Sequence, residues 1–173
     1  MKSSVCCFSG YRPEKMPKDM PEGCAAFTDM LSRLRNAIQK AADNGCRHFL
    51  SGMSRGFDLW AAEMVLELQM QGLYIDLWAA IAYPGMQQYW EPEWQKRYHT
   101  VLSQAARIFP VFDRYQPECY TIRDRFLVEQ SSRCICFFDG TPGGTAYTVA
   151  YARRSGLQID NLADMQLTFD ECL

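Results

Sequence analysis

The sequence has no apolar run long enough to cross a membrane and no excess of basic residues. A membrane span needs about 18 mostly apolar residues in a row, and polar or charged residues interrupt each apolar stretch sooner. The apolar start at residues 5–8 is likewise too short for a signal peptide. The formal net charge is -2, and broad nucleic-acid binding normally requires a basic surface. We therefore expect neither a membrane nor a nucleic acid as a partner.

Cysteine is plentiful, with eight residues, but the spacings typical of metal and redox sites are missing. No Cys-x-x-Cys pair occurs, and no histidine cluster accompanies the cysteines. Cys6 and Cys7 are adjacent, and Cys134 and Cys136 share one face of an expected strand. The other four stand alone in the sequence: Cys24, Cys46, Cys119 and Cys172. This usage favours a reduced, cytoplasmic protein in which cysteine serves as a small buried side chain and no metal is bound.

What the sequence does contain is a regular alternation of short apolar segments and amphipathic segments. The apolar segments predict strands at residues 5–9, 47–51, 74–83, 107–112, 133–138 and 157–162. The amphipathic segments predict helices at residues 25–43, 58–71, 93–105, 117–131 and 145–155. Nearly continuous apolar strands that alternate with helices are typical of a parallel sheet covered on both faces. We therefore expect an α/β three-layer sandwich formed by one domain over residues 1–173.

Two glycine-rich turns each follow an expected strand and lead into an expected helix. Residues 51–58 read Ser-Gly-Met-Ser-Arg-Gly-Phe-Asp, and residues 139–146 read Asp-Gly-Thr-Pro-Gly-Gly-Thr-Ala. The start of a helix presents unpaired N–H groups and the positive end of the helix dipole. Glycine lets a phosphate oxygen approach those groups closely. Because both turns fall at the carboxyl edge of the sheet, together they predict a composite site for a phosphorylated or nucleotide-like ligand.

In the second turn, Gly143 and Gly144 are the residues expected to contact a phosphate through their backbone. Thr145, and more weakly Thr141, would add a hydroxyl. The alternative is an ordinary tight turn in which Thr145 is the N-cap of the helix.

In the first turn, Gly52 and Gly56 are the corresponding candidates for contact with the ligand. Ser51 and Ser54 either donate hydroxyls to the ligand or satisfy the backbone of the turn. Asp58 either stabilises the helix dipole or accepts hydrogen bonds from ribose hydroxyls, as acids do in dinucleotide folds. A carboxylate in direct contact with a phosphate would repel it.

Two arginines also qualify as ligand-binding residues. Arg12 lies in the loop after the first strand together with Gly10, which is also a candidate for contact with the ligand. The Arg12 guanidinium would hold a phosphate or carboxylate with two hydrogen bonds, or else form a structural salt bridge. Arg123 shares a helix face with Cys119 and Leu127, so it points at least partly inward. It either serves the ligand pocket or pairs with a buried acid.

At these segments the sequence resembles the SLOG superfamily, which includes the LOG phosphoribohydrolases and the DprA/Smf proteins. Within it, the match is to the bacterial YpsA-like branch. The resemblance spans nearly the whole chain and depends on these segments: residues 10–13, 51–58, 61–63, 117–123 and 139–145. It implies a Rossmann-like fold and a site for a nucleotide or a nucleotide-derived ligand.

One departure from that superfamily concerns catalysis. LOG enzymes have a catalytic glutamate on the helix after their proline-glycine-glycine turn, whereas no acid occurs here between Gly140 and Ile159. We therefore expect a module that binds or senses an NAD- or ADP-ribose-like molecule, with no required cofactor. One alternative is a hydrolase of an N-glycosidic bond that uses Asp58, Glu63 or Asp124. A DprA-like protein associated with single-stranded DNA is another, and a homodimer is compatible with the sequence.

Overall fold

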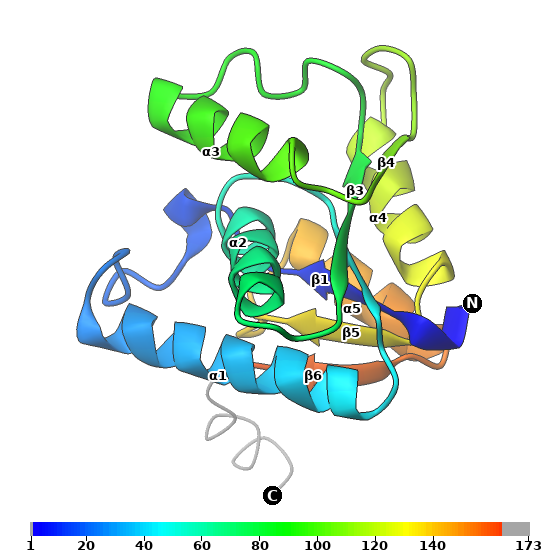
Figure 1. Cartoon of the computed structure of the whole chain (residues 1–173). Coiled ribbons are helices and arrows are strands. Elements are labelled where there is room, and N and C mark those ends of the chain that lie inside the picture. Colours follow the sequence, from blue (N-terminus) through cyan, green and yellow to red (C-terminus); the bar gives the residue numbers. More distant parts are fainter. Residues whose placement is uncertain (1, 164–173) are drawn as a thin grey trace, which may run out of the picture.

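Six parallel strands form the centre of the computed structural model, which describes residues 2–163 (Figure 1). The strands are β1 (Val5–Ser9), β2 (His48–Ser51), β3 (Asp76–Ile81), β4 (Arg107–Pro110), β5 (Arg133–Cys136) and β6 (Gln158–Asn161). The helices are α1 (Ala25–Asp43), α2 (Phe57–Met70), α3 (Pro92–Leu102), α4 (Cys119–Glu129) and α5 (Gly144–Arg154), with short 3-10 turns η1 (Lys2–Ser4) and η2 (Pro13–Lys15). The expected α/β fold with a parallel sheet is confirmed.

The strand order across the sheet is β4-β3-β2-β1-β5-β6. The chain builds the sheet outward from β1 to β4 and then returns to place β5 on the other side of β1. β1 and β5 are therefore neighbours, and Ser9 is paired with Cys136 at their carboxyl ends. The loops that leave these two strands start side by side and separate in opposite directions. Ligands of such sheets bind at this point of reversal.

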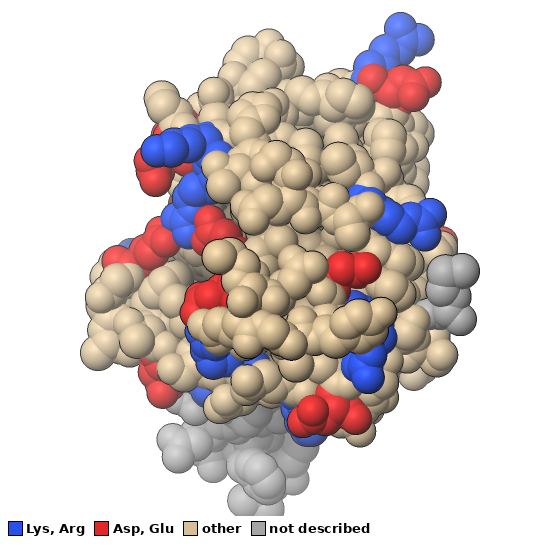
Figure 2. All heavy atoms as spheres, in the orientation of Figure 1, with Lys and Arg blue, Asp and Glu red and all other residues tan. Residues whose placement is uncertain are grey.

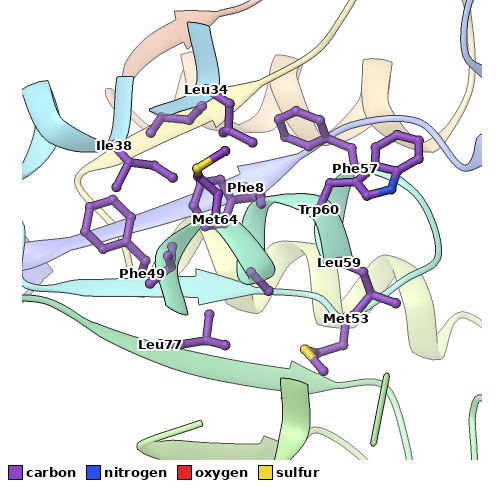
Figure 3. Packing of buried hydrophobic residues seen from close by; sticks show 14 of the residues in the cluster. Phe8, Leu34, Ile38, Phe49, Met53, Phe57, Leu59, Trp60, Met64 and Leu77 are labelled. Carbon is purple, nitrogen blue, oxygen red and sulfur yellow. The ribbon is translucent and has the colours of Figure 1, made fainter. Parts of the chain in front are cut away.

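Alternate residues of the central strands pack into two different hydrophobic layers. Phe8 of β1 faces α1 and α2 (Figure 3). Cys6 belongs to the same layer, whereas Val5 and Cys7 face α4 and α5. Helix α3 packs mainly on α2 rather than on the sheet. Ser9 follows Val5 and Cys7 in the two-residue period of the strand, so its side chain lies on the α4–α5 side.

The ends of the elements differ from the sequence prediction by at most three residues. The clearest difference is α4, which begins at Cys119 and not at residue 117, because Glu118 adopts a left-handed conformation with φ of 63°. Pro117 therefore precedes the helix. None of the described helices is long and apolar enough to span a membrane.

The cysteines of the described residues are free thiols, and all of these except Cys24 are buried. Cys7 and Cys134 lie opposite each other on β1 and β5. Burial raises the pKa of Cys6 well above its usual value, which keeps this thiol protonated and unreactive. Cys172 lies outside the described residues.

Candidate functional site

A cavity of about 230 Å³ opens at the carboxyl ends of β1 and β5, where the strand order reverses. Its wall is formed by the loop after β1, by one face of α4 and by the start of α5, and the first glycine-rich turn contributes to one side. The predicted site residues that line it are Gly10, Arg12, Asp58, Arg123, Asp124, Gly143, Gly144 and Thr145. Ser51, Gly52, Gly56, Thr141 and Glu63 are not among its lining residues.

The second glycine-rich turn presents an open backbone to this cavity. Gly143 is the N-cap of α5 with φ of 145°, and no side chain caps the helix there. A Cβ built on Gly144 would meet no atom within 4 Å. The N–H groups of the first turn of α5 are therefore free to bind an anion.

Two nearly buried residues with hydroxyl side chains, Ser9 and Thr145, line the cavity, and neither hydroxyl has a partner in the described part of the chain. Ser9 is 7% exposed and Thr145 is 8% exposed, and among the described residues neither side-chain oxygen has a hydrogen bond. Thr145 is thus not the N-cap of α5, the alternative that the sequence left open. Neither oxygen is among the fully buried unpartnered atoms of the described residues, so both are accessible from the cavity to a polar ligand or to water.

Tyr11 connects the loops that leave β1 and β5. Its hydroxyl donates to Oδ1 of Asp139 at 2.7 Å and accepts the Asp139 N–H at 3.1 Å. Burial and the bond to Asp139 raise the pKa of Tyr11 to about 12, so this hydroxyl remains a donor at neutral pH. Burial opposes ionisation of Asp139, but hydrogen bonds from Tyr11 and Thr141 outweigh it and lower the pKa of this carboxyl. The connection holds the second glycine-rich turn against the rim of the cavity.

The glycines of the first turn pack against the protein's own chain. Gly56 has φ of 86°, and a Cβ there would lie 2.5 Å from the carbonyl oxygen of Tyr11. A Cβ on Gly52 would lie 2.9 Å from both Cζ of Arg123 and Oδ2 of Asp58. The Ser51 hydroxyl donates to the Asp58 carbonyl at 2.9 Å, the second of the two roles the sequence allowed for it.

Gly10 lines the cavity but is also constrained by packing. A Cβ on this residue would collide with the ring of Phe57 at the start of α2. Glycine is therefore required at this position because the loop after β1 lies very close to α2, and this holds with or without a ligand.

Arg123 joins the first turn to α4. It is 5% exposed, and its guanidinium donates to the Gly52 carbonyl, to Oδ1 of Asp124 at 2.8 Å and to the Ser54 hydroxyl at 3.4 Å. The sequence left two roles open for Arg123, lining the ligand pocket or pairing with an acid. In the structure its side chain does both.

Asp58 is a buried acid at the cavity wall. Its Oδ2 accepts the Ser54 N–H at 3.3 Å, but no ion pair involves it within the described chain. Burial raises the pKa of Asp58 to about 7; Arg123 opposes the rise and the nearby Asp124 carboxylate adds to it. Asp124 is held by Arg123 and by the Thr148 hydroxyl, 3.3 Å from its Oδ2. Two carboxyl groups, from α2 and α4, therefore line the cavity.

Two cationic residues, Arg12 and Lys15, line the cavity, and neither has an ion-pair partner among the described residues. The Lys15 Nζ lies 3.5 Å from where a Cβ on Gly143 would be, and the Arg12 guanidinium lies 5.9 Å from the centre of the Tyr120 ring. Glu14, between them, pairs with Arg55 of the first turn at 3.0 Å. That pair fixes the segment and leaves its two other charges available to a ligand.

Glu63 is the predicted acid that the structure does not bring to the cavity. Both of its carboxylate oxygens accept from Arg97 of α3 at 2.7 Å, on the surface that α2 shares with α3. Thr141 is exposed, and its N–H donates to Oδ1 of Asp139. Both residues were predicted from their position in or near a motif, which does not reveal the face of the helix or turn on which a side chain lies.

Sequence reasoning missed several lining residues, chiefly Ser9, Tyr11, Lys15, Tyr120 and Thr148. Ser9 was detectable in principle, because it is the last residue of a strand at the ligand-binding edge. Lys15 gave no such signal, since it lies in an irregular segment whose path only packing decides.

Comparisons with known proteins agree on the fold and on the family. A family model described as the YspA SLOG family (YpsA) matches residues 6–171. A UPF0398 protein of Bacillus cereus (strain G9842) is 28% identical over 176 residues, covering 96% of this chain and 91% of that protein. Another, of Bacillus thuringiensis (strain Al Hakam), is 29% identical over 174 residues with the same coverage.

Two solved structures share the fold. The structure of DNA processing protein A (DprA) from Streptococcus pneumoniae has a TM-score of 0.61 and 14% identity, covering 92% of this chain and 50% of that chain. A DprA structure from Helicobacter pylori, described as showing a unique single-stranded DNA binding mode, has a TM-score of 0.59 and 14% identity, covering 91% and 64%. This chain therefore spans about half to two thirds of their length, and at this identity the likeness shows the fold alone.

Proposed function

Because the chain belongs to the YspA SLOG family, we propose that it binds a nucleotide or a nucleotide-derived ligand in the cavity at the carboxyl ends of β1 and β5. The main support is the free N-terminus of α5, where an open Gly143-Gly144 backbone meets the unpaired Lys15 and the unpartnered Thr145 hydroxyl. An anionic group placed there gains backbone N–H donors and a nearby cation. NAD- and ADP-ribose-like molecules carry such groups.

A titration of the purified protein with NAD, ADP-ribose, AMP and other nucleoside phosphates tests this proposal. A ligand at 100 times its dissociation constant stabilises the fold by about 2.7 kcal/mol, which thermal unfolding detects. Gly144→Val should abolish the shift, because the added side chain enters the open space in front of the helix. Ala146→Val is the matched control, since Ala146 is in the same helical turn but does not line the cavity. No shift with any ligand would refute the proposal.

Hydrolysis of an N-glycosidic bond is a second candidate function, favoured by one observation. Asp58 lines the cavity with a pKa of about 7, the range in which a side chain both donates and accepts protons efficiently. Such an acid would protonate the leaving base or activate water. Chromatography of nucleotide incubations should show free base with the wild type and none with Asp58→Asn. Glu63→Gln, outside the cavity, should retain the activity; product release that survives Asp58→Asn would refute this mechanism.

Association with single-stranded DNA is a further candidate, suggested by the fold that the chain shares with DprA. The net charge of -2 opposes it, and basic and acidic side chains are interspersed on the face seen in Figure 2. Fluorescence anisotropy with a labelled oligonucleotide decides the question. Binding that weakens steeply as salt rises would support DNA as a partner, and no binding in dilute buffer would remove it.

A further inference from the structure

The connection between β1 and α1 contains a strap, residues 12–23, that carries two cationic residues of the cavity wall (blue in Figure 1). Arg12 and Lys15 belong to the strap, and both line the cavity. The Lys15 side chain extends to the second glycine-rich turn, where its Nζ lies 3.5 Å from the position of a Cβ on Gly143. The position of the strap therefore decides whether these two charges face the cavity.

The backbone of the strap is not joined to the sheet or to the helices. Within the described chain, its backbone–backbone hydrogen bonds stay inside the strap or reach only the residue after it. Three short turns follow one another, each closed by a bond between a proline carbonyl and an N–H three residues later: Pro13–Met16, Pro17–Met20 and Pro21–Cys24. A single turn is not stable in isolation, because closing the first hydrogen-bonded turn is unfavourable. The strap therefore depends on side-chain contacts to stay in place.

Arg55 of the first glycine-rich turn holds one end of the strap. Its Nη2 lies 3.0 Å from Oε1 of Glu14, and its Nη1 lies 3.4 Å from Oε2 of Glu91, the residue before α3. The Arg55 side chain is 18% exposed, whereas that of Glu14 is 53% exposed. If the strap moved away, Arg55 would keep Glu91 as a partner, so the broken pair would leave no uncompensated cation.

Arg97 of α3 holds the other end in the same way. Its Nη1 lies 2.8 Å from Oε1 of Glu22, and its Nη2 lies 2.7 Å from Oε2 of Glu63 on α2. Its guanidinium also lies 4.6 Å from the centre of the Trp94 ring. Both acids of the strap are partly exposed, and such ion pairs contribute little to stability and weaken in salt. They suit a contact that breaks and forms again.

The apolar attachment of the strap is small. Met16 is 7% exposed and belongs to the main hydrophobic layer, and the partly buried Met20 packs against that layer. Methionine is flexible and adapts to different surroundings. At one end of the strap, Tyr11 stays fixed by its bond to Asp139. At the other, Gly23 has φ of 92° with no atom near the position of a Cβ, so the chain has room to turn there.

We propose that the strap is a gate: residues 12–23 move away from the cavity when their two ion pairs break and return when the pairs form again. Arg55 and Arg97 are then positioning residues, because they place the two cations of the strap at the cavity without contacting a ligand themselves. Opening of the strap does not depend on the identity of the ligand, whereas its role in ligand entry rests on the proposed function.

Limited proteolysis with trypsin measures the opening, because the strap contains two cleavage sites, after Lys15 and after Lys18. When opening and closing are fast compared with cleavage, the cleavage rate follows the population of the open form. Glu14→Gln and Glu22→Gln should each raise this rate about threefold, and the double variant about tenfold, the effect of losing partly exposed ion pairs. Urea unfolding should be nearly unchanged in all three proteins.

Glu67→Gln is the matched control, because Glu67 pairs with Arg35 away from the strap and its side chain is similarly exposed. Its cleavage rate should equal that of the wild type. Sodium chloride should raise cleavage of the wild type, relative to a peptide substrate, and leave the double variant unaffected, since salt weakens only a pair that is present. Equal rates in all proteins, an equal salt effect in the double variant, or a parallel loss of stability in urea would overturn the gate.

Addition of NAD, ADP-ribose or AMP connects the gate with the proposed function. A compound that binds only under the closed strap should slow cleavage about a hundredfold when present at 100 times its dissociation constant. A compound that binds in calorimetry without slowing cleavage would overturn the role of the strap in ligand entry and leave the proposed function intact. If none of the compounds binds, the proposed function fails, while the variants and the salt series still decide whether the strap opens.

Discussion

The two glycine-rich turns occupy similar places at the carboxyl edge of the sheet but differ in what surrounds them. In the turn after β2, the chain itself fills the space next to Gly52 and Gly56. In the turn after β5, the space in front of Gly144 is empty. A glycine at such a turn indicates a close approach. The comparison shows that the approaching atoms belong to the protein in one turn and are available to a ligand in the other.

The two turns therefore have different roles. The first is closed by Arg123, which binds its backbone from α4, and it contributes only Ser54 and Asp58 to the cavity. The second contributes backbone N–H groups and is positioned by the Tyr11–Asp139 contact. Changes in the first turn should therefore act mainly on stability, and changes in the second mainly on ligand binding.

Arg123→Met should have the largest effect on stability. It removes a buried cation from Asp124 and from the Gly52 carbonyl, and breaking a buried ion pair costs about 3–5 kcal/mol. Urea unfolding measures the loss. The control is Arg125→Met, at an exposed position on the same helix, and its loss of stability should be negligible compared with that of Arg123→Met. A loss below about 1 kcal/mol in Arg123→Met would show that the closed turn does not depend on this contact.

Gly56→Ala should cost about 2–4 kcal/mol, because the left-handed backbone and the overlap with the Tyr11 carbonyl both oppose a side chain. Gly85→Ala shares the positive φ, at 91°, without a nearby atom, so it measures the backbone contribution alone. Gly144→Ala has neither obstacle and should change stability by less than about 0.5 kcal/mol. Thermal or urea unfolding measures these changes. Equal losses of stability in Gly56→Ala and Gly144→Ala would show that the two turns do not differ in packing.

Asp58 should make stability depend on pH. Its pKa rises from 3.8 to about 7 on folding, so the folded state holds a proton that the unfolded state has released in this range. The stabilising contribution is complete below about pH 4 and is lost as the pH rises through about 7, with a slope of up to about 1.4 kcal/mol per pH unit. Asp58→Asn should remove that slope from urea unfolding measured between pH 5 and 8. Parallel profiles of the two proteins would contradict the burial of an uncompensated acid.

Tyr11→Phe should cost about 1–2 kcal/mol of stability, less than Arg123→Met or Gly56→Ala, since it removes the two hydrogen bonds to Asp139. It should also weaken ligand binding, because the second turn loses its connection to the loop after β1. Tyr151→Phe removes a surface hydroxyl bound to Glu129 and should change neither property. Unchanged ligand affinity in Tyr11→Phe would show that the second turn holds its position alone.

The sequence predicted the elements well because each rests on local periodicity. The continuous apolar run of β1 and the apolar face of α1 required no knowledge of tertiary contacts. The family was also recognisable, because its motifs lie at the strand-to-helix turns. Site residues were harder to place. Glu63 was selected for its closeness to a motif, but its position along α2 turns its carboxylate towards Arg97.

The sequence by itself determined the parallel α/β layers, the glycine turns at one edge and the family, since these depend on local pattern and chain order. Only the tertiary structure decided which turn is open. That outcome depends on the packing of Phe57 against Gly10, on the reach of Arg123 from α4, and on the path that brings Lys15 over Gly143. Such contacts join residues far apart in the chain, and their geometry follows from how whole elements pack.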